Sequence, residues 1–432
     1  MPEPHCHSMP VAAMPTTART ATPRVASIVI YPAAGQQDSA HQYLSALAAY
    51  SKSLLGNLSQ AAQQQHVVLT NLKAGRPAVH YDGALRVDEC WRKGSFLFWW
   101  QILRALRAYP NLAVVHVQHE FNQFGSFFTI PFIPIMIGVI RFILRKKTAI
   151  TFHEVIPPDR LNQAFLTKSG IPVPAFLARA LLVNYYRFVA ASASVIFVQD
   201  EIFADALHAM RIRRPLRILR IGTDQDVPLL ERAAARRALG YTDADHVLLF
   251  FGTVDWRKGL DLLLEVFQRM QNPQLRLIIA GGQPVRIRTT REYQAWHAAL
   301  LQRATALAPR VAWHGFIAHD QLAQLMAATD LVVLPYVVPQ RVSAVLNTAA
   351  SYEKPCIASQ YLAGQADPIT LFPATPEALA AKITWALAHL DVLQQAARAF
   401  KKKNDWRISA AVLEQTYGEL LAGSLKFTPQ DQ

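Results

Sequence analysis

The sequence predicts an α/β protein with two Rossmann-like halves. Short apolar runs alternate with helical patterns along the chain, and these runs have no regular polar positions. That pattern is typical of parallel strands whose two faces are both covered by helices. The series starts again after residues 219–224. Because 432 residues exceed the usual size of one domain, we expect two doubly wound sheets.

In the first half, the apolar runs predict five strands with helices between them. Each run is five to seven residues long and rich in Val, Ile, Phe or Thr, which suits strands. The predicted strands are 25–31, 66–70, 113–117, 148–152 and 194–198, and the predicted helices are 40–55, 95–108 and 176–190.

The second half repeats this alternation. A helix is expected from Leu260, because apolar residues recur there at the i, i+3, i+4, i+7 spacing, and the same spacing begins again at Leu322. A last helix follows the lysine run at 401–403. The predicted strands are 246–251, 275–280, 310–315, 331–335 and 355–359, and the last helix is 405–423.

The composition favours an anionic partner. Lys and Arg outnumber Asp and Glu by 44 to 30, a formal net charge of +14, so nucleic acid, acidic lipid headgroups and phosphorylated small molecules are candidates. The sequence has no zinc-finger spacing and no RNP-like aromatic strand, which argues against nucleic acid. Its three widely spaced cysteines, Cys6, Cys90 and Cys356, favour a reducing compartment and hence the cytoplasm.

Residues 127–144 are nearly long and apolar enough to span a bilayer. Arg141 interrupts the segment and two prolines lie in its first half, so we expect a buried helix between two strands. Cations follow at 145–147, and an aromatic stretch lies at 96–100. A peripheral position on the anionic inner face of the cytoplasmic membrane therefore stays open, with the arginine-rich residues 211–220 as a further candidate contact.

The loop at residues 252–259 follows a predicted strand and leads into a predicted helix. In open α/β sheets, ligands bind beyond the carboxyl ends of the strands. Arg257 and Lys258 lie in this loop, and the NH groups and dipole of the following helix also favour an anion. A diphosphate site and a solvated basic loop both fit this pattern.

Two further strand ends in the same half offer backbone groups to an anion. The glycine turn at 279–284 lets a ligand approach the main chain closely, and Ser343 is placed to cap a helix after strand 331–335. Three such ends in one domain favour the diphosphate site.

The order of these motifs resembles the nucleotide-sugar domain of retaining family 4 glycosyltransferases of GT-B fold. Residues 245–390 contain FG-x-x-x-x-x-KG-x-x-x-LL, AGG-x-P, WHGF, LPY, S-A-V-L and K-P-C-I-A-S in this order. The resemblance implies that Lys258 contacts the donor diphosphate and that the helix start at Ser343 caps the distal phosphate. The implied donor-binding residues are Gly252, Thr253, Arg257, Lys258, Gly281, Gly282, Gly315, Phe316, Ser343, Ala344, Val345 and Thr348.

The resemblance also assigns parts of the chain to roles. Residues 24–222 are expected to form the acceptor domain and residues 223–400 the nucleotide-sugar domain. Residues 1–23 are interpreted as a flexible leader, and residues 401–432 as a helix that packs back on the first domain, followed by a tail.

In the first half, His153 matches a family histidine that lies beside the transferred sugar. It follows strand 148–152 in a T-F-H context, and with Lys258 it is the implied catalytic residue. His116 and His119 are three residues apart and should point to opposite faces of their strand, so no metal site is assigned. The implied acceptor-binding residues are Gly35, Gln36, His119 and Glu120.

The sequence departs from the family pattern at the donor site. Thr253 and Asp255 take the places where an arginine is usual, which leaves Arg257 as a substitute. The two glutamates of the family, spaced eight apart, fall near Gln340 and Thr348. The second glutamate normally accepts hydrogen bonds from the ribose, so a weakened or inactive member fits the sequence as well.

The implied reaction moves a sugar from a nucleotide-diphosphate sugar to a saccharide or lipid-linked saccharide, with retention, in bacterial polysaccharide or glycolipid synthesis. Protein cations and NH dipoles would stabilise the leaving diphosphate, so no metal or other cofactor is expected. A glycosidase would need a pair of carboxylates, which the sequence does not offer. An epimerase, a sugar phosphorylase and a noncatalytic scaffold at the membrane remain as alternatives.

Overall fold

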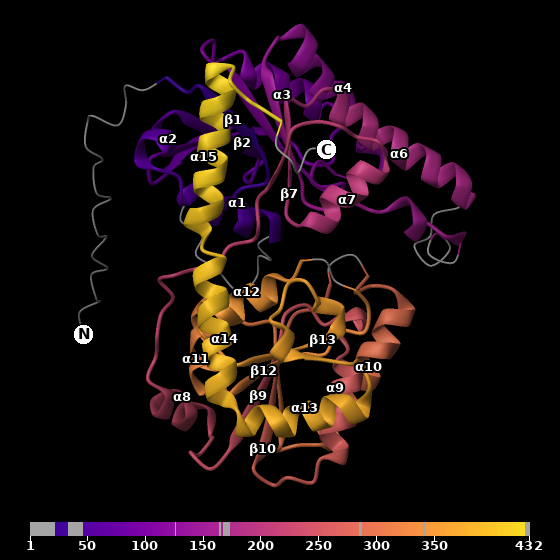
Figure 1. Cartoon of the computed structure of the whole chain (residues 1–432), viewed down its shortest axis with the longest axis vertical. Coiled ribbons are helices and arrows are strands. Elements are labelled where there is room, and N and C mark those ends of the chain that lie inside the picture. The colour runs from indigo at the N-terminus through magenta and orange to yellow at the C-terminus, as the bar shows by residue number, and fades with distance from the viewer. Residues whose placement is uncertain are drawn as a thin grey trace, which may run out of the picture.

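The computed structural model of the chain describes residues 22–32, 46–125, 127–163, 166, 173–284, 287–339 and 342–427. Within these ranges the helices and strands form two α/β domains, one above the other in Figure 1. Each domain is built on its own sheet, and the chain passes from the first sheet to the second between Ile218 and His246.

The first sheet has eight strands among the described residues, in the order β3-β4-β2-β1-β5-β6-β7-β8. All neighbours are parallel except β3 and β4, which form an antiparallel hairpin. The sequence patterns did not predict this hairpin at the sheet edge. The strands are β1 (Val25–Ile28), β2 (His66–Asn71), β3 (Ala78–Asp82), β4 (Leu85–Trp91), β5 (Val114–His119), β6 (Lys147–Phe152), β7 (Val195–Val198) and β8 (Leu216–Ile218).

Apolar clusters cover both faces of this sheet. Alternate residues of β1 belong to different clusters: Ala26 and Ile28 to one and Val25 to the other. The first cluster joins the sheet to α3, α4, α6 and α7, and the second joins it to α1 and the C-terminal helix α15. These helices are α1 (Ala46–Gly56), α3 (Phe98–Leu106), α4 (Phe132–Gly138), α6 (Ala175–Ala191), α7 (Glu201–Ala209) and α15 (Trp406–Ala422); the short α2 is Gln60–Gln64.

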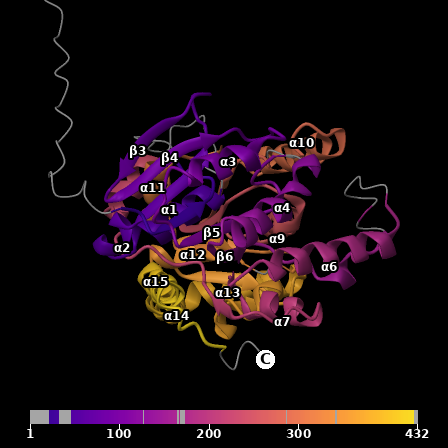
Figure 2. The ribbon, with the colours of Figure 1, turned by 90° about the horizontal axis from the view of Figure 1, so that it is seen from above.

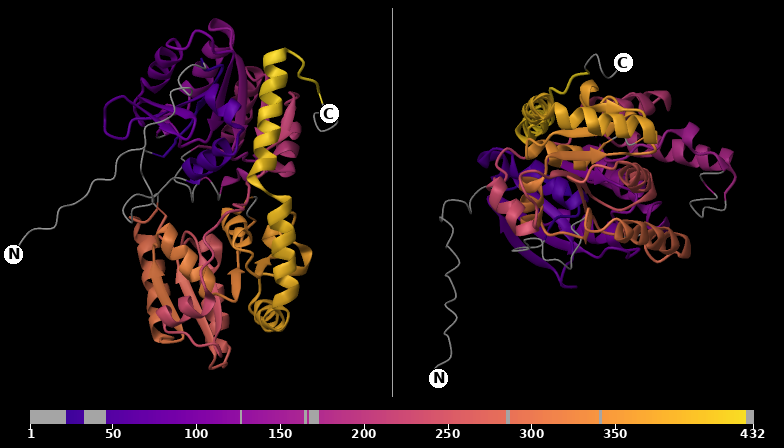
Figure 3. Two further views of the ribbon diagram at one scale, coloured as in Figure 1. Left: turned by 90° about the vertical axis from the view of Figure 1, so that its left-hand side faces the viewer. Right: turned by 90° about the horizontal axis from the view of Figure 1, so that it is seen from below.

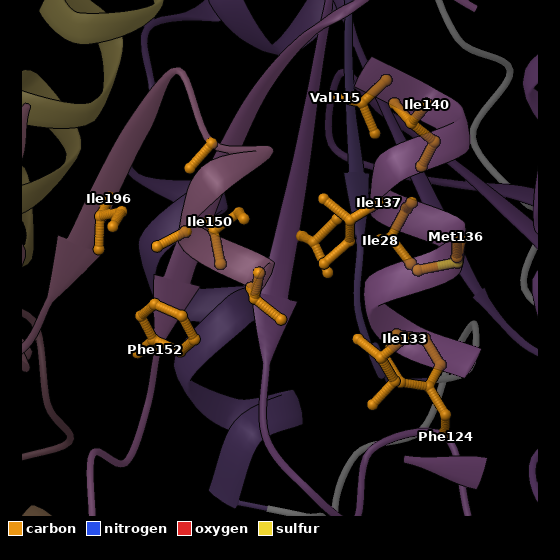
Figure 4. Packing of buried hydrophobic residues seen from close by; sticks show 14 of the residues in the cluster. Ile28, Val115, Phe124, Ile133, Met136, Ile137, Ile140, Ile150, Phe152 and Ile196 are labelled. Atoms are coloured by element: carbon orange, nitrogen blue, oxygen red, sulfur yellow. The ribbon is translucent and has the colours of Figure 1, made fainter. Parts of the chain in front are cut away.

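The apolar segment 127–144 folds as three short helical pieces instead of one long helix. They are η2 (Phe127–Thr129), α4 and the π-helical turn η3 (Val139–Ile143). One side of α4 and η3 is buried: Ile133, Met136, Ile137 and Ile140 pack on the sheet near Ile28 and Val115 (Figure 4). Within the described ranges, none of the helices combines the length and apolar character that crossing a membrane requires.

The second sheet has six parallel strands in the described residues, in the order β11-β10-β9-β12-β13-β14. The strands are β9 (His246–Phe251), β10 (Leu275–Ala280), β11 (Val311–Gly315), β12 (Leu331–Leu334), β13 (Cys356–Ser359) and β14 (Leu371–Phe372). Its helices are α8 (Arg232–Leu239), α9 (Leu260–Arg269), α10 (Arg291–Ala306), α11 (His319–Ala328), α12 (Ala344–Ser351), α13 (Pro376–Ala388) and α14 (Leu390–Lys403).

Two helices at the end of the chain run along one side of both domains. Figures 1 and 3 show α14 beside the second domain and α15 continuing along the first. The apolar face of α15 packs into the second of the two clusters of the first domain through Trp406, Leu413 and Tyr417, which are at most 5% exposed. The first domain is therefore completed by residues that follow the second domain in sequence.

The two segments that connect the domains are fastened to each other. The NH of Thr223 donates to the carbonyl of Asn404 at 2.6 Å, and its hydroxyl donates to the carbonyl of Lys401 at 2.8 Å. Beside them, a Cβ on Gly222 would lie 2.3 Å from the Trp406 ring, so only glycine fits there. The two connecting segments are thus joined to each other by hydrogen bonds.

Candidate functional site

Lys258 lies in the loop between β9 and α9, at the carboxyl end of the second sheet. The short helix η5 (Trp256–Lys258) begins at Asp255 and ends at Gly259, which has a φ of +69° and opens α9. A Cβ on Gly259 would lie 1.9 Å from the carbonyl oxygen of Pro335, so this loop lies directly against the loop after β12. The side chain of Lys258 is half-buried at this contact.

A tyrosine links the ammonium of Lys258 to the start of α12. The Nζ atom lies 3.9 Å from the centroid of the Tyr336 ring, a cation–π distance. On the other side, the Tyr336 hydroxyl is 3.0 Å from the Oγ of Ser343. Ser343 caps α12 and accepts the NH of Leu346, while the first NH groups of the helix have no partner within it.

The electrostatic surroundings weaken the hold of Lys258 on its proton. Burial lowers the pKa of Lys258 to about 8, the neighbouring Arg257 adds to this effect, and Asp255 opposes it. Lys258 is thus still mainly protonated at neutral pH, but its ammonium group is only partly hydrated. An anion that binds to this ammonium would displace little water from it, so the desolvation cost of binding would be small.

Three glycine turns after β9, β10 and β11 lie against one another. The NH of Gly281 donates to the carbonyl of Gly315 at 2.7 Å, and the NH of Gly252 donates to that of Ala280 at 3.0 Å. A Cβ on Gly281 would lie 1.8 Å from the Gly252 oxygen, and one on Gly252 would lie 2.9 Å from the Val345 side chain. The turns and the first turn of α12 therefore form one continuous backbone surface.

Arg257 is paired within its own loop. Its guanidinium contacts the Asp255 carboxylate at 2.6 Å, and Asp255 is 3% exposed at its side chain while Arg257 is half exposed. Burial alone would raise the pKa of Asp255, but hydrogen bonds from Arg257 outweigh this and lower it. Arg257 therefore balances a buried carboxylate as well as presenting a charge to the surface. Thr253 lies in the same loop, directly after Gly252, and is exposed.

The first domain contributes to the surroundings of this loop. The hydrogen bond to Asp255 raises the pKa of Arg257, and the Glu154 carboxylate on the first domain adds to this electrostatically. In addition, Val342, which directly precedes Ser343, packs against the apolar core of the first domain. The loop of Lys258 and the start of α12 thus lie on the side of the second domain that faces the first.

His153 follows β6 and is held between two glutamines. Its Nε2 donates to the Oε1 of Gln118 at 2.7 Å, and the amide of Gln199 donates to its Nδ1 at 2.7 Å. Burial, with a smaller contribution from His119, lowers the pKa of His153 to about 3. The imidazole is therefore neutral, with both nitrogens engaged, and stands next to the exposed Glu154.

The other residues that the sequence suggested for the acceptor have varied positions. His119 is fully buried, and its Nε2 is 2.6 Å from the hydroxyl of Tyr185, while Glu120 next to it is half-buried. His116 contacts Tyr417 on the opposite side of the sheet. Gly35 and Gln36 lie outside the described residues.

The remaining donor-side residues lie at the ends of strands or at the start of α12. Gly315 has a φ of +67°, and Phe316 after it is 39% exposed. Gly282 accepts the NH of Val254 at 2.9 Å, which ties the turn after β10 to the loop after β9. Ala344 is exposed, and the hydroxyl of Thr348 donates back to its carbonyl at 2.9 Å. Gln340 lies outside the described residues.

The sequence patterns missed three partners of the site. Tyr336 was part of a recognised motif but carried no assigned role, and Gln118 and Gln199 were not singled out. Gln199 directly follows a predicted strand, as His153 does, so position at a strand end was the available signal. In the described part of the chain, no group of three or more His, Cys, Asp or Glu residues could hold a metal ion.

Comparisons with known proteins agree with this architecture. Residues 245–389 match the family model of group 1 glycosyl transferases. A D-inositol 3-phosphate glycosyltransferase of Xylanimonas cellulosilytica is 26% identical over 192 residues, which are 42% of this chain and 43% of that protein. The match thus spans less than half the length of this relative.

Solved structures of similar shape cover nearly the whole chain. A sucrose-phosphate synthase from Thermosynechococcus elongatus is similar with a TM-score of 0.69 and 19% identity, over 93% of this chain and 100% of that one. The Anabaena protein HepE, solved with UDP, is similar with a TM-score of 0.62 and 16% identity, over 93% and 100% of the two chains. The GT-B fold expected from the sequence is therefore confirmed, and its second domain matches the group 1 glycosyl transferases.

Proposed function

We propose that the protein transfers a hexose from a nucleotide-diphosphate sugar to a hydroxyl acceptor, with retention of configuration. The observation that carries this proposal is the grouping of Lys258, three glycine turns and the first turn of α12 around one surface that faces the first domain. The match of residues 245–389 to group 1 glycosyl transferases supports it, as does the similarity to a structure solved with UDP.

In the proposed reaction, the bond between the sugar and the diphosphate breaks and a bond to the acceptor oxygen forms. The acceptor proton and the bonding electrons leave with the nucleotide diphosphate. Negative charge then develops on the phosphate oxygens, where a fixed ammonium and helix NH groups are most effective. Lys258 and the backbone at Ala344 and Val345 have this role in our proposal.

His153 has a positioning role in this proposal. With a pKa of about 3, its imidazole is not a base at neutral pH. The two glutamines fix the ring with its proton on Nε2, next to Glu154. We therefore assign no proton transfer to His153 and expect it to orient the sugar, with Gln118 and Gln199 holding it in place.

We further propose a saccharide or lipid-linked saccharide as the acceptor, in bacterial polysaccharide or glycolipid synthesis. The resemblance of residues 245–390 to family 4 glycosyltransferases supports this. An alternative is a noncatalytic GT-B protein that acts as a scaffold. Two contacts favour the alternative: Thr348 offers only a hydroxyl where the family has a carboxylate, and Arg257 is already paired with Asp255.

Calorimetry with a panel of UDP-, GDP- and ADP-sugars separates the two. We expect one donor to bind, and Lys258→Ala to weaken its affinity about 10- to 100-fold, because a charged contact to phosphate is lost. Lys382→Ala is a matched control, since Lys382 also lies over an aromatic ring, at 4.0 Å from Trp385, but on α13. The Lys382→Ala variant should bind the donor with the affinity of the wild type. A chain that binds no donor is a scaffold.

The reaction itself is tested by its products. Retention predicts that the new glycosidic bond has the anomeric configuration of the donor, which NMR of the product shows. Turnover that needs no acceptor indicates an epimerase instead. Because protein groups supply the positive charge, EDTA should leave the rate unchanged; a rate that falls with EDTA and returns with Mg²⁺ contradicts this part of the proposal.

A further inference from the structure

The outer face of α6 is apolar although it is exposed. Leu177, Leu181 and Phe188 are separated by four and seven residues, so they lie on one side of the helix. Their exposed fractions are 42%, 59% and 70%. The buried residues of the helix are Tyr186, Val189 and Ala190. Figures 1 and 2 show α6 projecting from the first domain, with this helix extending beyond its neighbours.

Neighbouring helices continue the apolar surface. Helix α6 contacts α4, and α4 contacts α3. The Phe96 ring, just before α3, is 6.2 Å from the Phe132 ring of α4. Because the inner sides of α4 and η3 pack on the sheet (Figure 4), their remaining apolar residues face outward. The exposed ones on these elements are Phe96 and Leu97 before α3, Trp100 on α3, Ile135 on α4, and Phe142 and Ile143 on η3.

The same segments are basic. Residues 92–107, 127–147 and 175–191 contain ten Lys and Arg and no Asp or Glu. Several of these cations are exposed, among them Arg92, Lys93 and Arg145. The Arg104 guanidinium lies 5.7 Å from the Trp100 ring. Exposed apolar side chains on segments whose charged residues are all cations complement an apolar layer under anionic headgroups.

We propose that this surface, formed by residues 92–97 and the outer sides of α3, α4, η3 and α6, docks on an anionic lipid bilayer. The aromatic and aliphatic side chains enter the headgroup region, and the cations pair with lipid phosphates. The surface belongs to the domain that carries His153, and the Tyr186 hydroxyl of α6 accepts the NH of Ile156 at 3.1 Å. Docking would therefore hold the loop after β6 close to the membrane. The proposal is independent of the reaction proposed above.

Flotation with vesicles tests the proposal directly. The full chain is mixed with vesicles of phosphatidylcholine containing about 30% phosphatidylglycerol or none, at about 0.1 M and 0.5 M salt. We expect flotation with the anionic vesicles at low salt, and at least a several-fold loss at high salt or without phosphatidylglycerol. Absence of flotation in every condition, or equal flotation with both lipids, overturns the proposal.

Variants locate the contact. Leu181→Gln with Phe188→Gln should reduce the bound fraction at least tenfold, and Arg92→Glu with Lys93→Glu should do so about tenfold. The matched controls are Leu301→Gln with Ile408→Gln, which are exposed apolar helix residues elsewhere, and Lys402→Glu with Lys403→Glu on α14. Controls that lose as much binding as the test variants overturn the location.

Two further measurements distinguish membrane docking from loss of fold and from self-association. Thermal unfolding and donor calorimetry should be unchanged in all four variants, because every altered side chain is exposed and none belongs to the donor site. Sedimentation velocity reports the oligomeric state. If the chain is a dimer that the α6 variant converts to a monomer, and vesicles do not bind, the surface is an interface between copies and the membrane proposal is wrong.

Discussion

Lys258 carries a charge that its environment makes easier to lose than that of an exposed lysine. Burial lowers its pKa to about 8, so the ammonium is present below that pH and is lost as the pH rises through it. If the ammonium holds the diphosphate, the donor dissociation constant should be constant below about pH 7. Above about pH 8 it should rise about tenfold per pH unit. Calorimetry from about pH 6.5 to 9.5 measures this.

Lys258→Arg provides the control for the titration. An arginine keeps its charge over the whole range, so the variant should bind the donor more weakly at neutral pH but without this pH dependence. A wild-type profile that stays flat up to about pH 9.5 would show that Lys258 does not meet the diphosphate.

Thr348 is the residue at which the proposed donor site departs most clearly from the pattern of family 4 glycosyltransferases. Its hydroxyl donates to the carbonyl of Ala344, four residues earlier, and offers no negative charge to a ribose. Thr348→Glu should therefore strengthen nucleotide-sugar binding about tenfold, because a carboxylate accepts hydrogen bonds more strongly than a hydroxyl does.

Thr384→Glu is the matched control for this change. Thr384 makes the same backbone bond, to Ala380 at 3.1 Å, but on α13. Its substitution should leave the affinity unchanged. Equal or weaker donor binding by Thr348→Glu would mean that the ribose does not lie near this turn of α12.

At the level of single residues, the sequence was most informative where a motif fixes both type and position. Lys258, Gly252 and Gly281 follow strands and Gly315 ends one, and a strand end is recognisable from the apolar run before it. For the partners of His153 and Lys258, a position at a strand end did not show which side chains would meet. Gln118, Gln199 and Tyr336 come from other strands or the loops after them, and only the sheet order brings them close.

The three glycine turns act as one structural element. Because a Cβ on Gly281 would lie 1.8 Å from the Gly252 oxygen, Gly281→Ala must move the two turns apart. We expect a loss of about 1–3 kcal/mol in the free energy of unfolding, together with weaker donor binding. Urea denaturation and calorimetry measure the two effects.

Gly418→Ala is the comparison for this substitution. Gly418 lies inside α15 with no atom within 4 Å of an added Cβ, so alanine should stabilise the helix by about 0.5–1 kcal/mol. If Gly281→Ala is equally harmless, the turns are not in the close contact described.

Among the elements, buried parallel strands were the easiest to predict. The run 246–251 coincides with β9. Every residue of this strand after His246 is apolar and buried, so the strand stands out in the sequence as a continuous apolar run. The hairpin β3–β4 was missed for the opposite reason. Strand β4 alternates buried and half-buried residues near the edge of the sheet, and polar residues such as Arg86 and Asp88 interrupt the apolar signal. Segment 127–144 was correctly assigned to a helical region, but its outer side is exposed.

For the molecule as a whole, three buried histidines and the half-buried His153 predict sensitivity to acid. Burial lowers the pKa of His66 to about 3, of His119 to about 4 and of His153 to about 3, and lowers that of His116 as well. In the unfolded chain they titrate near 6.5, so the stability they confer is full above that pH and is lost as the pH falls below it. At pH 5.5 the loss is about 1.4 kcal/mol for each histidine.

Together these losses reach the lower end of the range of about 5–15 kcal/mol that is usual for the stability of a protein. We expect the urea midpoint of the first domain to fall steeply between about pH 7 and pH 5.5, as followed by tryptophan fluorescence and circular dichroism. His314→Gln, at an exposed position, should leave this pH dependence as it is in the wild type. A midpoint that stays constant down to about pH 5 contradicts the prediction.

The place of α15 has a consequence for the order in which the molecule can be made. Trp406, Leu413 and Tyr417 line the same apolar cluster as Val25 and Val114. While the ribosome is still synthesising the second domain, the first domain lacks α15. The apolar side chains of its strands that α15 would cover are then exposed to solvent. The domain that is translated first is thus the last to complete its core. Nascent chains should therefore depend on chaperones until α15 leaves the ribosome.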